Sequence, residues 1–245
     1  MIRIPWQLRL AVLLLTCSLT VYLAKLILID NLQGTVEYVF NSLGFLFINV
    51  LLVTLVINEL LSKRARNERL EKLNMVIGIF FTEAGNELIS RIIIADPARS
   101  RFGDPFILRG KEKPEVRIMK SVLSEHRFSI DPEKIDMKDL QEFLEDKRNF
   151  LLRLMENPVL LEHQSFTAML LSTFHLAAEL GHRHDLSALS HPDSLHIAGD
   201  ISRVYQNLTL EWIQYMVYLN KNYPYLYSLA VRTNPYDPFA TAEVT

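Results

Sequence analysis

The stretch YVFNSLGFLFINVLLVTLVIN, residues 38–58, has no charged side chain in 21 consecutive positions. An α-helix rises about 1.5 Å per residue, so a stretch of this length can cross the roughly 30 Å hydrocarbon core of a bilayer. An earlier apolar run, residues 10–29, is almost as long and contains one charge, Lys25. Together the two runs predict a two-helix transmembrane hairpin over residues 1–61.

Basic residues predict how this hairpin is oriented. They lie before the first run and directly after the second, whereas the connection at residues 30–37 contains acids and no base. Because cytoplasmic flanks of membrane helices are enriched in lysine and arginine, we expect both termini in the cytoplasm and the protein in the inner (plasma) membrane. The basic residues are Arg3, Arg9, Lys63, Arg64, Arg66, Arg69 and Lys72.

Three polar residues inside the runs have structural interpretations. Lys25 lies near the outer end of the first run, where its long stem can carry the ammonium to water. Ser42 and Asn49 are seven residues apart and therefore share one helix face. Polar groups in lipid seek partners, so this face predicts packing against the first helix or homo-oligomerisation. A channel lining is the weaker alternative.

Composition excludes several functions for the rest of the chain. The 26 Lys and Arg nearly balance the 28 Asp and Glu, so there is no charge footprint of a nucleic-acid binder. The one cysteine, Cys17, falls in the first apolar run, which rules out a disulfide framework, a cysteine-rich zinc site and thiol catalysis. No glycine-rich phosphate loop or Gly-x-Ser-x-Gly elbow is present.

The pattern after residue 61 is helical, without an alternating run typical of a strand. A stalk helix is expected over residues 62–95, ending at Asp96-Pro97, and a cytoplasmic helical domain over 96–245. Residues 96–114 are expected to form a loop, followed by helices from residue 114, from Asp136, from Ser165 to Gly181 and from about Asp193. The aromatic tail at 223–236 predicts a short packed helix or a docking surface. The fold is therefore predicted to be all-α, a transmembrane hairpin followed by a cytoplasmic helical bundle.

Five residues near two of these helix ends are candidate metal ligands. His175, Glu179 and His182 lie at i, i+4 and i+7 in a helix that we expect to be central and mostly enclosed, and His196 and Asp200 lie at i and i+4 in the next. The Glu-x-x-His spacing is one that di-iron and di-manganese bundles use. Imidazole and carboxylate ligands suit iron, zinc or manganese, and haem is the other candidate cofactor.

The same residues also have a purely structural interpretation. No second Glu-x-x-His is present, and Gly181 places His182 at the end of its helix. In this interpretation His175 is a core histidine, and Glu179 pairs with Arg183 or Arg203, because a buried charge needs a partner.

Three segments resemble a group of uncharacterised prokaryotic membrane proteins that have two N-terminal transmembrane helices and a helical cytoplasmic domain. The segments are ERLEKLNMVIGIFFTEAG at 68–85, LLEHQSFT at 160–167 and YPYLYSLA at 223–230. The resemblance implies a shared helical domain and no assigned activity.

Two functions follow from these features. The leading hypothesis is a membrane-anchored module that senses, scaffolds or assembles at the cytoplasmic face without catalysis. The alternative is a metal- or haem-dependent membrane enzyme with its site in the bundle core. The cofactor, the substrate and any protein partner other than a second copy are not specified by the sequence.

Overall fold

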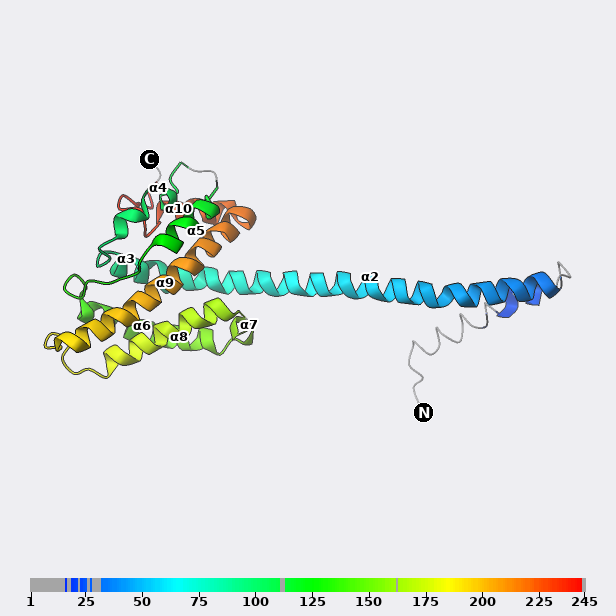
Figure 1. The fold of residues 1–245 in the computed structure, drawn as a ribbon, viewed down its shortest axis with the longest axis horizontal. Coiled ribbons are helices and arrows are strands. Elements are labelled where there is room, and N and C mark those ends of the chain that lie inside the picture. Colours follow the sequence, from blue (N-terminus) through cyan, green and yellow to red (C-terminus); the bar gives the residue numbers. More distant parts are fainter. Residues whose placement is uncertain are drawn as a thin grey trace. The chain divides into compact units, whose positions relative to one another are not determined.

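The computed structural model describes Thr16, residues 19–21, 23–25 and 27, and residues 32–110, 113–161 and 163–243. Two compact units divide the chain, Met1–Arg66 and Asn67–Thr245. Figure 1 shows the described residues as helices joined by turns and loops. The prediction of an all-α fold is confirmed for the described part of the chain.

The first unit contains the beginning of helix α2, which extends over Leu32–Phe80. Apolar side chains of α2 are exposed along residues 36–61, with Phe47 at 74% and Leu51 at 61%. Among the described residues, one helical segment, Gln33–Ile93, is long and apolar enough to cross a membrane. The predicted hairpin partner at residues 10–29 falls largely outside the described residues, within which one long apolar helix is found rather than a two-helix hairpin.

The helix changes its winding after Phe80. A π-helical turn, η1 (Phe81–Gly85), follows α2 and leads directly into α3 (Asn86–Ile93). The backbone N–H of Asn86 donates to the carbonyl of Phe81, five residues earlier, as a π-turn requires. The end of α3 agrees within a few residues with the predicted stop at Asp96-Pro97.

Short and long helices make up the rest of the second unit. The helical segments are η2 (Arg99–Arg101), α4 (Gly103–Phe106), α5 (Val116–Glu125), α6 (Met137–Met155), α7 (Pro158–Leu161), α8 (Gln164–Gly181), α9 (His191–Asn222) and α10 (Pro224–Arg232).

Helix α9 is the central helix of this unit. It lies between α8 with α6 on one side and α5 with α10 on the other (Figure 1). Its apolar positions, including Ile201, Tyr205 and Trp212, are buried along most of its length. The prediction that the Ser165–Gly181 helix is central was wrong, because that helix, α8, leaves Leu171 51% exposed. The sequence of α8 is apolar on nearly every side, so periodicity did not reveal its outer face.

The predicted loop at residues 96–114 is more ordered than expected. It contains η2 and α4, and the side chains of Phe102, Phe106 and Leu108 are almost completely buried. The side-chain amide of Asn234 donates to the Phe106 carbonyl at 2.6 Å, which ties this segment to the C-terminal tail. The segment is therefore part of the core, held by a contact between residues 128 positions apart.

The predicted helix ends were confirmed at most positions. Asp136 caps α6 by accepting hydrogen bonds from two backbone N–H groups. Helix α8 ends at Gly181, and the tail forms the short helix α10 as expected. Ser165 is not the cap of α8: the Nδ1 atom of His163 accepts from the Phe166 N–H and takes that role.

Candidate functional site between helices α8 and α9

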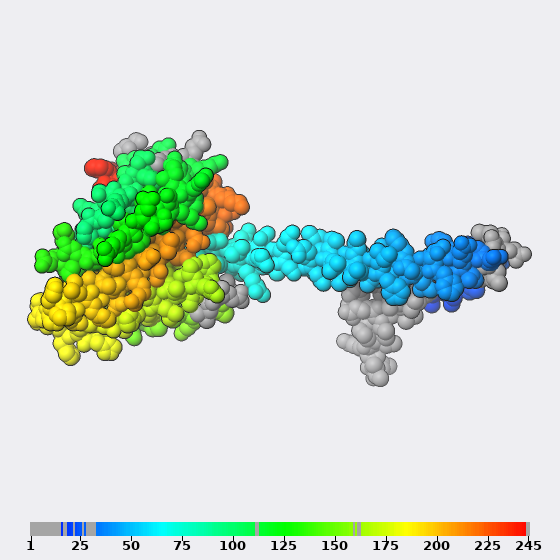
Figure 2. All heavy atoms as spheres, viewed as in Figure 1, coloured from blue at the N-terminus to red at the C-terminus, as the bar shows by residue number. Residues whose placement is uncertain are grey.

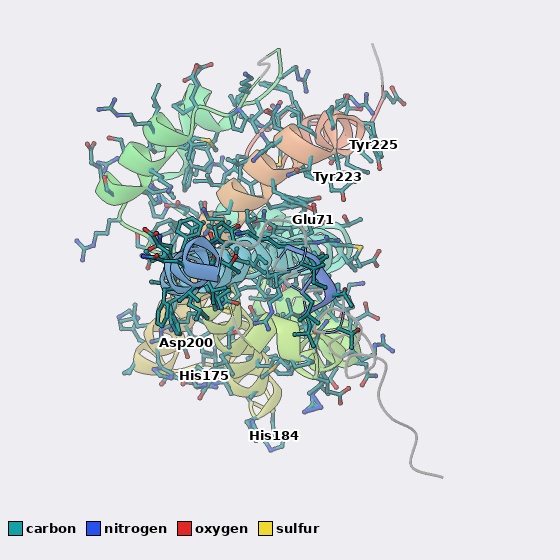
Figure 3. All side chains as sticks on the ribbon, turned by 90° about the vertical axis from the view of Figure 1, so that its right-hand side faces the viewer. Glu71, His175, His184, Asp200, Tyr223 and Tyr225 are labelled. Carbon is teal, nitrogen blue, oxygen red and sulfur yellow. The ribbon has the colours of Figure 1, made fainter. Side chains whose placement is uncertain are left out.

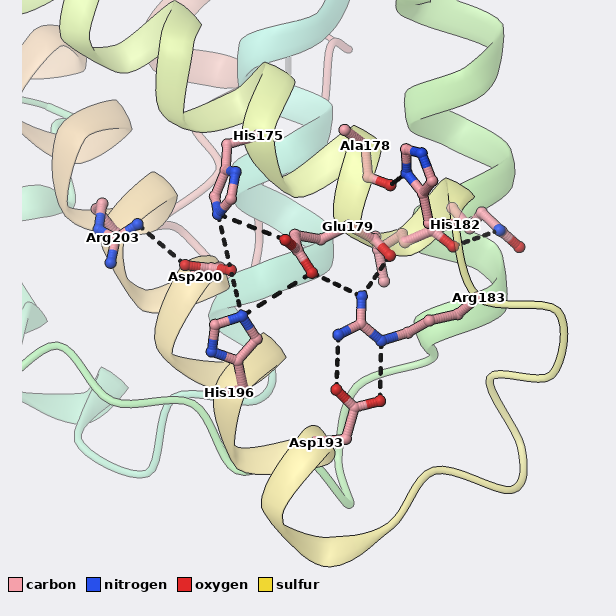
Figure 4. A network of polar contacts seen from close by, with 11 residues as sticks. His175, Ala178, Glu179, His182, Arg183, Asp193, His196, Asp200 and Arg203 are labelled. Carbon is pink, nitrogen blue, oxygen red and sulfur yellow. Dashed lines mark hydrogen bonds and ion pairs between the residues drawn. The ribbon is translucent and has the colours of Figure 1, made fainter.

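Four of the five predicted metal ligands lie together on the surface where α8 meets α9 (Figure 4). Asp200 Oδ2 is 3.3 Å from His175 Nε2 and 3.6 Å from His196 Nε2. The two carboxylate oxygens of Glu179 lie 3.9 Å from the same two imidazole nitrogens, one from each. We refer to His175, Glu179, His196 and Asp200 as the α8–α9 cluster.

The i, i+4 spacing on each helix explains half of this arrangement. Residues four apart face the same side of a helix, so each helix contributes one histidine and one carboxylate. The other half comes from the packing of α8 against α9, which brings the two faces together. Figure 2 shows the segment around residues 180–195 at the surface of this unit, close to where the cluster's two helices end and begin.

Arginines hold the outer sides of the two carboxylates. Arg183 donates to Glu179 Oε2 at 2.8 Å and makes a two-point contact with Asp193 at 2.6 and 2.9 Å. Arg203 donates to Asp200 Oδ1 at 3.0 Å. The hydrogen bond from Arg183 lowers the pKa of Glu179 and that of Asp193 below their ordinary values, so both carboxyl groups are ionised at neutral pH. The predicted pairing of Glu179 with Arg183 is confirmed.

The interior of the cluster is less well satisfied than its outer sides. Asp200 has a side chain only 4% exposed, and its Oδ2 atom is buried without a hydrogen-bond partner among the residues that the structure describes. This oxygen faces the Nε2 atoms of His175 and His196 at distances too long or poorly aligned for hydrogen bonds. An unsatisfied buried carboxylate oxygen costs free energy, so the site is chemically suited to a cation placed between these atoms.

Two predictions about this region need correction. His182 does not join the cluster, because its Nδ1 atom lies 2.6 Å from the carbonyl of Ala178 at the end of α8. His175 is not a core histidine and the cluster is not in the bundle core, since the side chains of His175 and His196 are 48% and 56% exposed. The histidines and carboxylates therefore lie together as predicted, but at the surface of the domain and not in its core.

The distances between the donor atoms of the cluster are close to the distances between ligands of a bound metal, but most of them are longer. Two ligands of a tetrahedral metal with bonds of 2.0–2.1 Å lie about 3.3 Å apart. The His175–Asp200 distance matches this value, whereas the other three distances are longer by about 0.3–0.6 Å on the same standard. In the described part of the chain no three His, Cys, Asp or Glu side chains already form a coordination sphere. Metal binding requires the two exposed imidazoles to turn inward.

Buried ionisable groups elsewhere were missed by the sequence analysis. Asp96 and His126 form a fully buried pair with an Oδ2–Nε2 distance of 2.8 Å. Glu211 in α9 is 1% exposed, and within the described part of the chain both of its carboxylate oxygens are buried without a well-formed hydrogen bond. The residues on either side of Glu211 are apolar or aromatic in the sequence. A single carboxylate in such an apolar run is the sequence feature from which its burial could have been predicted.

Replacing Glu211 by glutamine is expected to stabilise the protein at neutral pH by about 1–2 kcal/mol. Burial raises the pKa of Glu211, and the nearby Ser165 hydroxyl and His163 oppose this shift only in part. A raised pKa in the folded state contributes stability that is complete below the unfolded value and is lost as pH rises through the folded value. The stability difference between Glu211→Gln and the native protein should therefore grow from about pH 4.5 upward, as urea unfolding at several pH values would measure. A difference that does not change with pH would contradict this reasoning.

Comparisons with known proteins show which protein family the chain resembles. Residues 2–61 match a family model described as the N-terminal helical domain of MJ1433, and residues 69–232 match one described as the C-terminal helical domain of the uncharacterized protein MJ1433. The uncharacterized protein MJ1433 of Methanocaldococcus jannaschii is 42% identical over 232 residues, which cover 95% of this chain and 94% of that protein. No solved structure matches the chain.

Proposed function

This chain belongs to the MJ1433 family, with an N-terminal and a C-terminal helical domain, and we propose that the first domain anchors it in a membrane. The second domain then acts at the cytoplasmic face by sensing, scaffolding or assembly rather than by catalysis. The cell inner (plasma) membrane is the proposed location, and the lipid bilayer is the first partner.

The exposed apolar surface of α2 is the observation that carries this proposal. No residue in the most apolar 18-residue stretch of this helix is buried. Large side chains such as Phe40, Phe47 and Leu51 are exposed. Apolar surface left in water costs about 25 cal/mol per Å², whereas hydrocarbon accommodates it at no such cost. Residues 38–58 have the length that a bilayer core requires.

The described part of the first run is consistent with a second spanning helix. Its described residues are helical, and Val21 and Ile27 are exposed at 67% and 81%. The ammonium of Lys25 lies 4.9 Å from the ring centroid of Tyr38, a cation–π contact that supports the expected position near the outer surface. With basic residues following α2's apolar stretch, this favours a hairpin with both termini inside.

Homo-oligomerisation through α2 is a further part of the proposal. Asn49 is exposed in the middle of the apolar stretch, and Ser42 lies one heptad earlier on the same face. An amide in hydrocarbon is stabilised when it bonds to another polar group, and a second copy offers an identical one.

Membrane extraction and labelling together test the anchor. We expect the full-length protein to stay in the membrane fraction after alkaline carbonate treatment. On a Cys17→Ser background, Gln33→Cys should react with an impermeant maleimide in intact cells, whereas Thr241→Cys should react only after permeabilisation. Release by carbonate, or labelling of both positions from outside, would refute the anchor or its orientation.

Divalent-metal binding at the α8–α9 cluster is a second candidate function, favoured by the unpartnered Asp200 Oδ2 between two imidazole nitrogens. Arg203 holds Oδ1 of Asp200 and leaves Oδ2 facing both histidines, whereas Arg183 holds Oε2 of Glu179, so the arginines would orient the two carboxylates. Two imidazoles and two carboxylates suit zinc, iron or manganese. A bound metal at this exposed position would support either metal sensing or a metal-dependent membrane enzyme.

Metal content separates this candidate from a purely structural cluster. The detergent-purified full-length protein is expected to bind one Zn²⁺ per chain, and His175→Ala should weaken the affinity about 10-fold or more. His184→Ala removes an exposed histidine from the neighbouring loop and should leave the affinity unchanged. Absence of stoichiometric metal, or equal losses in the two variants, would rule out the site.

A further inference from the structure

A concave site lies away from the α8–α9 cluster. Residues of α2, η1, α3, α9 and α10 surround a cavity of about 700 Å³, within the range of small-molecule pockets. Figure 3 shows Tyr223 and Tyr225 on one side of this unit and His175 and Asp200 on the other. We call this cavity the tyrosine pocket, because Tyr215, Tyr218, Tyr223 and Tyr225 line it.

The walls of the tyrosine pocket are aromatic and partly pre-arranged. Tyr223 makes edge-to-face contacts with Tyr218 and Tyr225, at centroid distances of 5.7 and 6.3 Å. Tyr215 is stacked on Phe81 at 5.0 Å, which fixes its ring. Burial raises the pKa of Tyr218 to about 12, so this phenol is neutral at physiological pH. Neutral aromatic faces attract cations through their quadrupole.

The charged groups of the pocket are acceptors. Among the described residues, Glu83 and Glu87 are the charged side chains that line it, and none of its lining residues there is Lys, Arg or His. Glu87 is paired with Arg91 at 2.6 Å, whereas Glu83 has no ion-pair partner in the described part of the chain. The Oδ1 atom of Asn86 is buried, and no described residue donates a hydrogen bond to it. A ligand that donates hydrogen bonds and carries positive charge would satisfy these groups.

The π-helical turn explains how these groups come together. One extra residue per turn shifts the register of the helix after Phe80, and the residues of this turn and just after it, Thr82, Glu83 and Asn86, all line the pocket. Single π-turns inside α-helices are costly and occur frequently at functional sites. The local winding is therefore a second sign, independent of the cavity, that this surface binds a ligand.

We propose that the tyrosine pocket binds a small organic ammonium ion with an aromatic or branched apolar body. The ammonium group lies at Glu83 and Asn86, and the apolar body lies between the tyrosine rings and the leucines of α10. This proposal does not depend on the membrane anchor or on metal binding.

Matched probes of opposite charge test the proposal on the full-length protein in maltoside micelles. Phenethylammonium and 3-phenylpropanoate have similar shapes, and saturation-transfer NMR reports binding of either. We expect saturable binding of the cation and none of the anion. Glu83→Gln should weaken binding of phenethylammonium about fivefold, because it removes one exposed charge. Tyr225→Ala should weaken this binding further, because it removes an aromatic wall.

Two controls make the result decisive. Glu125→Gln removes an exposed carboxylate outside the pocket and should leave binding of phenethylammonium unchanged. Gly78→Leu places a side chain in the pocket and should abolish binding while the circular dichroism spectrum stays native. Equal binding of the cation and the anion, or cation binding that survives both Glu83→Gln and Gly78→Leu, would overturn the proposal.

Discussion

Replacing His126 by alanine is expected to lower the free energy of unfolding by about 3–5 kcal/mol. The side chains of His126 and Asp96 are both fully buried, and His126 Nε2 lies 2.8 Å from Asp96 Oδ2. Removing the imidazole leaves the Asp96 carboxylate in the interior without its histidine partner, although the Ala98 N–H still donates to it at 2.7 Å. A buried charge without its partner is one of the few changes that destabilise a domain on this scale.

The aromatic neighbours of His126 add to this cost. Its ring packs against Phe102 and Phe128 at centroid distances of 4.4 and 4.7 Å, so truncation also opens a cavity. Urea unfolding in maltoside micelles, followed by tryptophan fluorescence, measures the effect. His184→Ala, at an exposed position, should change stability by less than about 0.5 kcal/mol.

A double-mutant cycle identifies the cause. If the pair itself is responsible, Asp96→Asn and His126→Ala together should cost clearly less than the sum of the two single changes. Strictly additive costs, or a loss below about 1 kcal/mol for His126→Ala, would show that the pair contributes little.

The Asp96–His126 pair is a contact that the sequence did not predict. The sequence predicts that the stalk helix ends at Asp96-Pro97 and that the next helix extends from Pro114 to His126. Both interpretations are correct locally, but the contact joins residues 30 positions apart and depends on how the segment between them folds. Glycine and proline spacing predicted turns there and did not reveal that Phe102 and Phe106 enter the core.

The α8–α9 cluster shows the opposite case. Helical periodicity placed His175 with Glu179 and His196 with Asp200, because i, i+4 geometry is a local property. Which side of α8 faces solvent depends on the packing of the whole domain. Because apolar residues occur on nearly all sides of that helix, its sequence did not predict the exposed side. Side-chain capping was similarly ambiguous: a serine was the expected cap of α8, but a histidine nitrogen two residues earlier accepts the hydrogen bond.

The π-helical turn was not predicted, and Gly85 shows why it matters. Gly85 lies under the rings of the two preceding phenylalanines, and a Cβ atom there would be 2.7 Å from Phe80 Cε1 and 2.6 Å from Phe81 Cδ1. Both rings are fully buried, and they pack edge-to-face on each other at 5.3 Å. Phe81 is also stacked on Tyr215, so neither ring has room to move aside.

Gly85→Ala is therefore expected to destabilise the protein by about 2–3 kcal/mol, despite the higher helix propensity of alanine. Gly199→Ala is the matched control: Gly199 is also within a helix, α9, but its added Cβ meets nothing within 4 Å. That variant should gain about 0.5–1 kcal/mol from helix propensity alone. Because the same chemical change is expected to have opposite signs, the two unfolding curves separate steric overlap from propensity. If Gly85→Ala is as stable as Gly199→Ala, the π-turn adjusts freely and the close packing of Phe80 and Phe81 does not define it.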